Sequence, residues 1–339
     1  MKIFCPMCNN HNLIPDEELS SNLFSILCEK CSQLLSVKIV VEALQVVKSE
    51  AAQQAGASKN RVSDYIRAHM DELNLPVLPI LAGKIRQAKQ TPNFSIANIV
   101  DLVKTDQIIA SKILELANSA AYGGLVEITD LKRAIIKLGL STTEMLVQAL
   151  ENRRIYSSDN IYVQSLLKEL WLHSLGVALS AQTIAKLLKM ESEAESEVFT
   201  AGLLHDFGYL LFVQALLQAK DFKVDLEAMN ITEFMEVAFE DHGKLGAQYL
   251  RERNLPKSLV TIVAFHEDIP PEEAENRQLH VVALANQLCK KVGLGPVHEP
   301  DLRLELTESA QTLDLNELKL ADLEVKCEDL VKTVAAVLG

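Results

Sequence analysis

The sequence has few aromatic residues, few glycines and few prolines, and it has no surplus of positive charge. Aromatic residues make up 5% of the 339 residues, with one Trp, and there are 13 Gly and 10 Pro. Lys and Arg total 33 against 46 Asp and Glu, a formal net charge of −13. This balance argues against broad electrostatic binding to nucleic acid or to an anionic membrane. The scarcity of aromatic side chains also disfavours a platform for stacking bases.

Long hydrophobic runs are lacking as well. The most apolar stretch, residues 201–219, is interrupted by His205-Asp206 and by two glutamines, so we interpret it as protein core and expect no membrane span. The N-terminus shows no charged segment followed by an apolar one, and we therefore expect a cytoplasmic protein. With 48% hydrophobic and 23% charged residues, the composition is that of a globular protein of two or three domains.

Four of the six cysteines lie near the N-terminus as two C-x2-C pairs: Cys5, Cys8, Cys28 and Cys31. Residues 9–27, 19 in all, separate the two pairs, and this spacing is typical of a structural zinc site. Four thiolates complete a closed tetrahedron around zinc and leave no position for a substrate. Unliganded cysteines are one alternative. Disulfides are another, which the expected reducing compartment disfavours.

Short β-strands are predicted at Ile3-Phe4 and over residues 37–41, which is rich in β-branched side chains. Together with the cysteines they predict a zinc ribbon over residues 1–47, followed by a polar linker over residues 48–62. The first 50 residues carry more acidic than basic side chains. We therefore expect the ribbon to contact protein or to stabilise its own fold, and not to bind nucleic acid.

From about residue 62 onward, apolar residues recur at helical spacing. Ser95 precedes an apolar stripe over residues 96–103 and is predicted to cap a helix. A second stripe predicts a helix over residues 108–117, and Thr129 is placed to open another that ends at Gly139. Short polar breaks between helices of this length predict an all-α domain.

The C-terminal part continues this pattern. Residues 295–312 contain two prolines and are predicted to form a loop. Residues 313–338 are predicted to form one or two helices that pack on the core, with a partner or dimer helix as the alternative.

Four histidines and one aspartate lie on predicted core faces or at predicted helix ends: His173, His205, Asp206, His242 and His266. One such histidine alone is more typical of a core residue than of a metal ligand. Four of them with an aspartate favour a site for Zn, Fe, Mn or Ni, among which the sequence does not discriminate. A single aspartate can bridge two ions that activate water and bind phosphate oxygens.

Several phrases of the sequence, in order, resemble the HDOD (HD-related output domain) family. The resemblance spans about residues 62–295. It implies a bacterial, all-α signalling output domain related to HD-type metal phosphohydrolases. The phrases are Leu75-Pro76-Val77-Leu78-Pro79, Leu116-Ala117-Asn118-Ser119-Ala120-Ala121-Tyr122-Gly123, Ala134-Ile135-Ile136-Lys137-Leu138-Gly139, Leu172-His173-Ser174, Gly202-Leu203-Leu204-His205-Asp206-Phe207-Gly208 and Glu240-Asp241-His242.

The same resemblance implies a ligand set. In HD-type hydrolases a first histidine, an adjacent His-Asp pair and a later aspartate hold one metal, and two-metal members add further histidines. The residues that match are His173, His205, Asp206, Asn286, His242 and His266.

Three positions depart from the family pattern. Asn286 replaces an aspartate, so one anionic ligand is lost, and Glu267 replaces a second adjacent histidine. Tyr209 stands where a lysine is common. No Gly-Tyr-Pro motif follows His266, so hydrolysis of cyclic di-GMP has no specific support.

We therefore expect an all-α, multi-helix HD-like HDOD domain preceded by a small β zinc ribbon. The expected boundaries of the HDOD domain are 63–295, with an N-terminal helical part over 63–155 and an HD-like part over 156–295, before a C-terminal helical extension over 296–339. The expected cofactors are Zn at the four cysteines and one or two divalent ions (Fe, Mn, Zn or Ni) in the HD-like pocket.

The expected function is intracellular signalling through contacts with other signalling proteins, and the chain could also form a homo-oligomer. One alternative is a metal-dependent phosphohydrolase acting on a phosphate ester or nucleotide. In that case Asp206 would hold the ions, and Glu267 could ligate or serve as a base. A second alternative is a metal-free scaffold whose histidines are ordinary core residues.

Overall fold

The computed structural model describes residues 81–122, 127–158, 161–218, 238 and 241–338, together with four short strands nearer the N-terminus. The chain divides into two compact units, Met1–Ala57 and Ser58–Gly339.

The first unit contains two antiparallel strand pairs. Strand β1 (Lys2–Phe4) pairs with β2 (His11–Leu13), and β3 (Leu23–Leu27) pairs with β4 (Leu34–Lys38). The predicted strand at Ile3-Phe4 is present. The strand predicted over residues 37–41 begins three residues earlier, because Leu34 pairs with Leu27 where the hairpin closes. The four cysteines lie outside the described residues.

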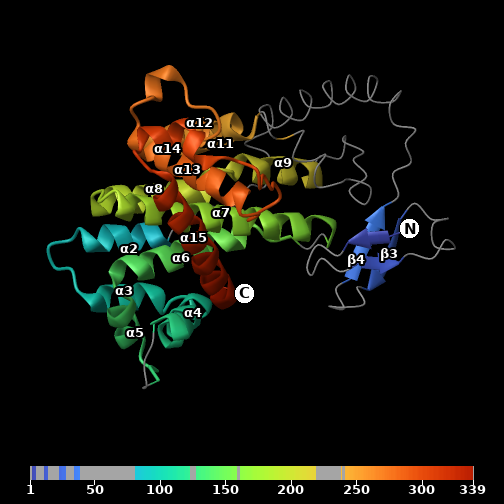
Figure 1. Cartoon of the computed structure of the whole chain (residues 1–339). Helices are drawn as coiled ribbons and strands as arrows, with labels where there is room; N and C mark the ends of the chain where they lie inside the picture. The colour runs from blue at the N-terminus through green and yellow to red at the C-terminus, as the bar shows by residue number, and fades with distance from the viewer. Residues whose placement is uncertain are drawn as a thin grey trace. The chain divides into compact units, whose positions relative to one another are not determined.

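The second unit is helical in the part that the structure describes, as predicted (Figure 1). Its helices are α2 (Leu81–Lys89), α3 (Ile96–Val103), α4 (Gln107–Asn118), α5 (Leu131–Leu138), α6 (Leu140–Ile155), α7 (Ile161–Leu187), α8 (Ser192–Leu204), α9 (Phe207–Gln218), α11 (His242–Glu252), α12 (Lys257–Phe265), α13 (Arg277–Lys291), α14 (Glu308–Thr312) and α15 (Glu317–Leu338).

Helix starts follow the capping side chains. Ser95 is the N-cap of α3, as predicted. Asp106 caps α4 and accepts hydrogen bonds from the N–H groups of Ile108 and Ile109 at 3.1 Å each. Asp130 caps α5, one residue later than the predicted Thr129, because its carboxylate accepts the N–H of a residue in the first turn of that helix.

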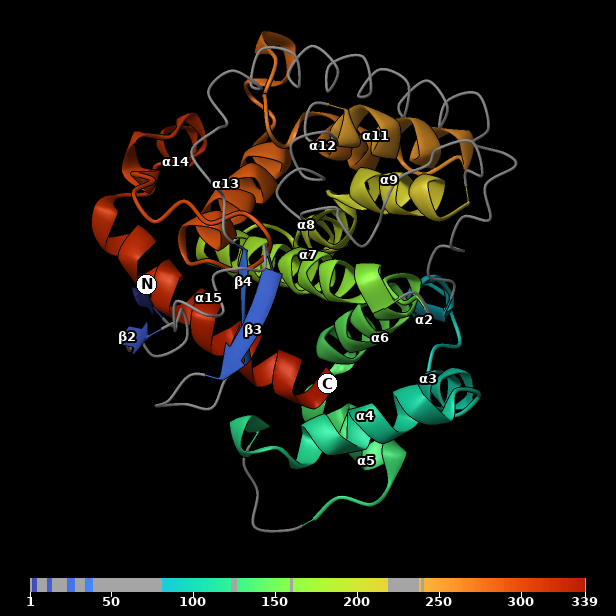
Figure 2. The same cartoon turned by 90° about the vertical axis from the view of Figure 1, so that its right-hand side faces the viewer.

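The long helix α7 forms the centre of this unit. It packs against α8, α13 and α15, which cover different sides of it (Figure 2). Its inward side chains, among them Leu167, Leu170 and Val177, are fully buried. Removing these side chains from water is the main favourable contribution to the packing.

The C-terminal segment differs from the prediction in one respect. Residues 295–312, predicted as a loop, contain a 3₁₀ turn at Leu304–Leu306 and the short helix α14. Leu304 and Ala310 are buried in the core, and this burial holds the segment in place. The residues beyond form one helix, α15, which packs on α7.

The most apolar stretch of the chain is core. Residues Ser192–Ala215 are long and apolar enough to cross a membrane, yet 89% of the apolar window is buried inside the protein. The interpretation of residues 201–219 as core is confirmed for residues 201–215, all of which are buried except Gln214.

Candidate metal centre

Five side chains that are far apart in the sequence converge in the helical unit. His173 comes from the middle of α7, while His205 and Asp206 follow the last residue of α8. His242 opens α11, and His266 follows the last residue of α12. All five are buried, with at most 5% of each residue exposed.

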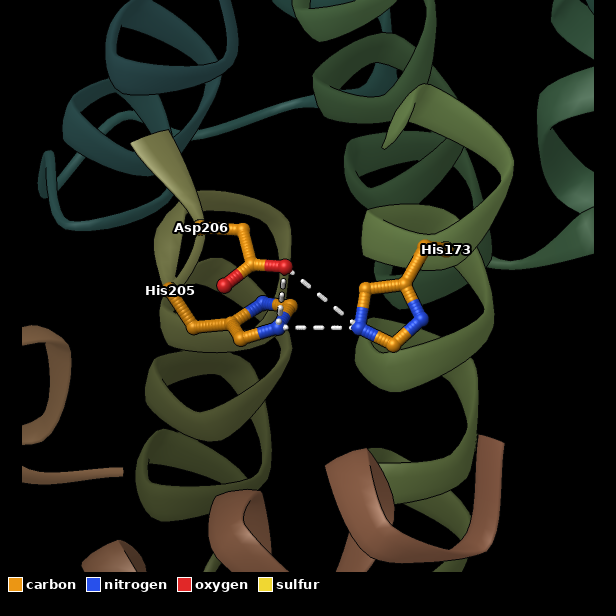
Figure 3. Close-up of side chains that lie close together, drawn as sticks. All are labelled: His173, His205 and Asp206. Carbon is orange, nitrogen blue, oxygen red and sulfur yellow. Dashed lines mark hydrogen bonds and ion pairs between the residues drawn. The ribbon is translucent and has the colours of Figure 1, made fainter. Parts of the chain in front are cut away.

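The first group consists of His173, His205 and Asp206, whose side chains point toward one another from adjacent helices (Figure 3). The two histidine Nε2 atoms are 3.3 Å apart. Oδ2 of Asp206 lies 3.5 Å from Nε2 of His173 and 3.3 Å from Nε2 of His205.

The second group shares the same aspartate. Oδ1 of Asp206 lies 3.3 Å from Nε2 of His242 and 3.3 Å from Nε2 of His266, and these two nitrogens are 3.1 Å apart. Asp206 therefore presents one oxygen to each pair of histidines.

Backbone carbonyls determine which ring nitrogen carries the proton. Nδ1–H of His173 donates to the carbonyl of Leu294 at 2.7 Å. Nδ1–H of His205 donates to the carbonyl of Gly202 at 2.8 Å, and that of His266 donates to the carbonyl of Val263 at 3.0 Å. A carbonyl oxygen can only accept a hydrogen bond, so the proton of each neutral ring is on Nδ1. The Nε2 atom of each of these rings then carries a lone pair. Metal-binding histidines usually donate their other N–H in this way.

Three of the four converging Nε2 atoms, those of His173, His205 and His266, are acceptors when their rings are neutral. They lie beside the Asp206 carboxylate, whose buried Oδ1 accepts no hydrogen bond of good geometry in the described part of the chain. A cation between these acceptors would satisfy them. The residues present therefore fit one or two divalent ions, with His173, His205 and Asp206 around one position and Asp206, His242 and His266 around the other.

The surroundings displace the pKa values of two groups in the centre. Burial lowers the pKa of His173 to about 4, which keeps its ring neutral at pH 7. Burial opposes the charge on Asp206, but the neighbouring rings of His205, His242 and His266 hold the pKa of that carboxyl well below its usual range. A carboxylate among imidazoles is a donor set that binds first-row divalent ions.

A hydrogen-bonded chain on α13 borders the centre. Oδ1 of Asn286 lies 3.1 Å from Nε2 of His173, and its Nδ2 donates to Oε1 of Glu267 at 2.9 Å. Lys290, one turn further along α13, donates to both oxygens of Glu267 at 2.6 and 2.8 Å. Burial opposes ionisation of Glu267, but the Lys290 ammonium lowers the pKa of Glu267 to about 2.

The hydrogen-bonded chain gives two of the family departures a role. Asn286 keeps a carbonyl oxygen beside His173 while its amide orients Glu267. Glu267 lies 3.7 Å from Nε2 of His266, so a second carboxylate is present at the edge of the second group. Lys290 was not predicted from the sequence. Its position four residues after Asn286, one turn along the same predicted helix, was the sequence signal that could have placed it near the centre.

Tyr209 is a structural element of the centre. Its ring stacks on His242 with a centroid distance of 4.2 Å and an interplanar angle of 12°. The tyrosine is buried, and its flat face fixes the orientation of the imidazole. A lysine at this position would leave His242 without that contact.

Gly208 allows α9 to lie against the start of α11. A Cβ at this position would lie 1.8 Å from the carbonyl oxygen of His242, far closer than atoms can approach. The glycine of the His-Asp-x-Gly phrase is therefore required by backbone packing, and this packing brings His242 to Asp206.

The helical unit thus carries a buried cluster of four histidines around one aspartate. The chain belongs to the HDOD domain family, whose model matches residues 75–269.

Solved structures share the fold. An HDOD domain protein of unknown function from Geobacter sulfurreducens has 23% sequence identity and a TM-score of 0.60, covering 83% of this chain and 98% of that one. A Shewanella amazonensis protein provisionally named a metal-dependent phosphohydrolase has 19% identity and a TM-score of 0.56, covering 86% and 100%. A Marinobacter aquaeolei protein provisionally named for signal transduction has 19% identity and a TM-score of 0.57, covering 79% and 60%.

Among curated proteins, an uncharacterized protein of Treponema pallidum is 22% identical over 277 residues. The match covers 80% of this chain and 51% of the relative, so the chain spans about half the length of the curated relative that it matches.

Proposed function

We propose that the protein is a metal-dependent phosphohydrolase whose centre holds two divalent ions bridged by Asp206. The observation that carries this proposal is the division of the Asp206 carboxylate, with Oδ1 facing His242 and His266 and Oδ2 facing His173 and His205. The sequence alone favoured a regulatory scaffold. The convergence of all five side chains favours the enzyme.

The number of donors supports hydrolysis over a purely structural role. Each position has two imidazoles and one carboxylate oxygen, so a bound ion would keep coordination sites open for water and substrate. Two divalent ions with the carboxylates of Asp206 and Glu267 leave an excess of positive charge, which suits an anionic phosphate ester.

The residues of the chain have separable roles in this proposal. Bound ions would supply an activated water and neutralise phosphate oxygens. Asp206 and the histidines orient the reacting groups, and the carbonyls of Leu294, Gly202 and Val263 fix the rings. Glu267, held ionised by Lys290, is the carboxylate that orients Asn286 and adds negative charge at the edge of the centre.

The first prediction tests catalysis. We expect protein loaded with Mn²⁺ to hydrolyse bis(p-nitrophenyl) phosphate, and His266→Gln to lower the rate at least about 100-fold because one position loses a ligand. The matched control is His280→Gln. His280 is also buried, but its Nε2–H donates to the carbonyl of Ala274 at 2.8 Å, away from the centre. Loaded wild type that hydrolyses neither phosphate monoesters, diesters nor nucleotides would contradict the enzyme proposal.

A regulatory role through contacts with other signalling proteins in the cytoplasm is the second candidate. It is supported by exposed apolar side chains on α15, where Leu318 is 82% and Val325 is 63% exposed. These residues are seven apart and lie on one side of the helix, where a partner protein or a second copy of the chain could cover them.

We also propose that the first unit is a zinc ribbon. The support is a repeated pattern along the chain: each strand pair is joined by six residues, 5–10 and 28–33, whose first and fourth positions are cysteines. Two hairpin connections of this kind can supply two thiolates each to one Zn²⁺.

The second prediction tests the ribbon. We expect the full-length protein to retain one zinc per chain after dialysis against a weak chelator, and Cys28→Ser with Cys31→Ser to lose it, because two thiolates cannot hold the ion tightly. Elemental analysis of the bound zinc gives the result, and Cys289→Ser is the control, since Cys289 is buried in the helical unit. Wild type without the retained zinc would contradict the ribbon.

A further inference from the structure

A cavity lies apart from the five residues of the metal centre, among α2, α6, α8 and α12. It measures about 210 Å³, and the apolar part of its lining includes Leu203, Leu204, Leu255, Leu259 and Ile262. Its size is below the roughly 300–1,000 Å³ of sites for drug-sized ligands, and so it suits a small metabolite with an apolar body.

Hydrogen bonds organise the polar part of the lining. Gln148 and Asn152 project from successive turns of α6, and Nε2 of Gln148 donates to Oγ1 of Thr200 on α8 at 3.2 Å. Nδ2 of Asn152 donates to the carbonyl of Leu203 at 3.2 Å. These bonds hold α6 against α8, so the polar wall is rigid before any ligand enters.

One positive and one negative side chain stand at the mouth. Arg86 and Glu197 line the cavity and also border the neighbouring surface hollow, which places them where the cavity opens. Arg86 uses Nε for Glu144 at 3.0 Å and Nη2 for Ser196 and Thr200 at 3.2 and 3.3 Å.

Each of these two charged side chains has one polar atom that could bind a ligand. Within the described part of the chain, Nη1 of Arg86 makes no hydrogen bond, and Oε2 of Glu197 accepts from Gln278 at 2.6 Å while Oε1 accepts none. A guanidinium and a carboxylate beside an apolar cavity match a carboxylate, an ammonium and an apolar side chain on one molecule.

We infer that this cavity binds an apolar α-amino acid, with its side chain among the leucines, its carboxylate at Arg86 and its ammonium at Glu197. The inference is independent of the proposed hydrolase activity, because none of these residues belongs to the metal centre. A fatty acid would use Arg86 alone, and an amine would use Glu197 alone. The paired charges favour the zwitterion.

The third prediction uses L-leucine and L-phenylalanine as probes in calorimetric titration of the full chain. We expect at least one of them to bind with a Kd below about 1 mM. We expect 4-methylpentanoate and 3-methylbutylamine, which each lack one charged group of leucine, to bind at least about tenfold more weakly.

A matched pair of variants locates the binding. Gly83 lines the cavity, and a Cβ there would meet nothing within 4 Å, so Gly83→Phe or Gly83→Leu adds a side chain at the cavity with no clash at its Cβ. We expect either variant to weaken binding at least about tenfold, while Lys84→Phe on the same helix leaves it unchanged. The inference is overturned if neither amino acid binds at about 10 mM. Equal binding of a one-charge analogue, or binding that the Gly83 variants do not alter, also overturns it.

Discussion

Asp206→Asn is expected to remove both ions from the helical unit while the protein remains folded. Each oxygen of Asp206 faces a different pair of histidines, so one substitution takes the anionic ligand from both positions. We expect the affinity for Mn²⁺ to fall at least about 100-fold at both positions. Titration of metal-free protein, followed by calorimetry and by the electron paramagnetic resonance signal of free Mn²⁺, measures the effect.

The stability of the metal-free protein separates binding from folding in this experiment. Asn has nearly the shape of Asp, and the buried Oδ1 of Asp206 accepts no well-formed hydrogen bond from the described residues. The rings around Asp206 favour its ionised form in the folded protein, so the metal-free variant should melt below the temperature of metal-free wild type. The stabilisation by added Mn²⁺ that wild type shows should disappear.

Asp101→Asn is the control for this prediction. Asp101 is exposed on α3 and pairs with Lys104, so its substitution should leave the metal content unchanged. An Asp206→Asn protein that still binds two ions per helical unit would contradict a bridging role. Loss of one ion only would mean that the aspartate serves a single position.

The helices and their caps could be predicted from the sequence because they depend on near neighbours. Ser95 ahead of an apolar stripe was sufficient to predict α3, and a second apolar stripe was sufficient to predict α4. Thr129 and Asp130 are both capping residues, and which of them caps α5 depends on where the helix begins. The prediction of a loop over residues 295–312 holds for residues 295–303, where both prolines lie. Beyond them a 3₁₀ turn and α14 form, because Leu304 and Ala310 are buried.

The metal centre could be predicted only as a list of residues. The spacing of apolar residues along the chain predicts that each histidine lies at a helix end or on a core face. It does not predict the distances between helices, because these depend on how the helices pack. The roles of Lys290 and of the Leu294 carbonyl could not be predicted, because a lysine in the last turn of a helix is ordinarily explained by the helix dipole. Only the fold shows that Lys290 turns inward to Glu267.

Gly208→Ala is expected to cause a large loss of stability although it adds a single methyl group. The new Cβ would lie 1.8 Å from the carbonyl oxygen of His242 and 2.5 Å from its carbonyl carbon. Both are backbone atoms, so no side chain can rotate away, and α9 and α11 must move apart. We expect destabilisation of about 3 kcal/mol or more. For a unit of this length that lowers Tm by roughly 6–12 °C, measured by calorimetry.

The separation of α9 from α11 should also disturb the centre, because His242 is the first residue of α11 and stacks on Tyr209 of α9. We expect the position formed by Asp206, His242 and His266 to lose more affinity for Mn²⁺ than the position formed with His173 and His205. Gly83→Ala is the matched control. Its Cβ meets nothing within 4 Å, and alanine at this exposed position of α2 should stabilise by roughly 0.5–1 kcal/mol. If Gly208→Ala and Gly83→Ala both melt at the same temperature as wild type, the close approach of α9 to α11 is not what holds His242 at the centre.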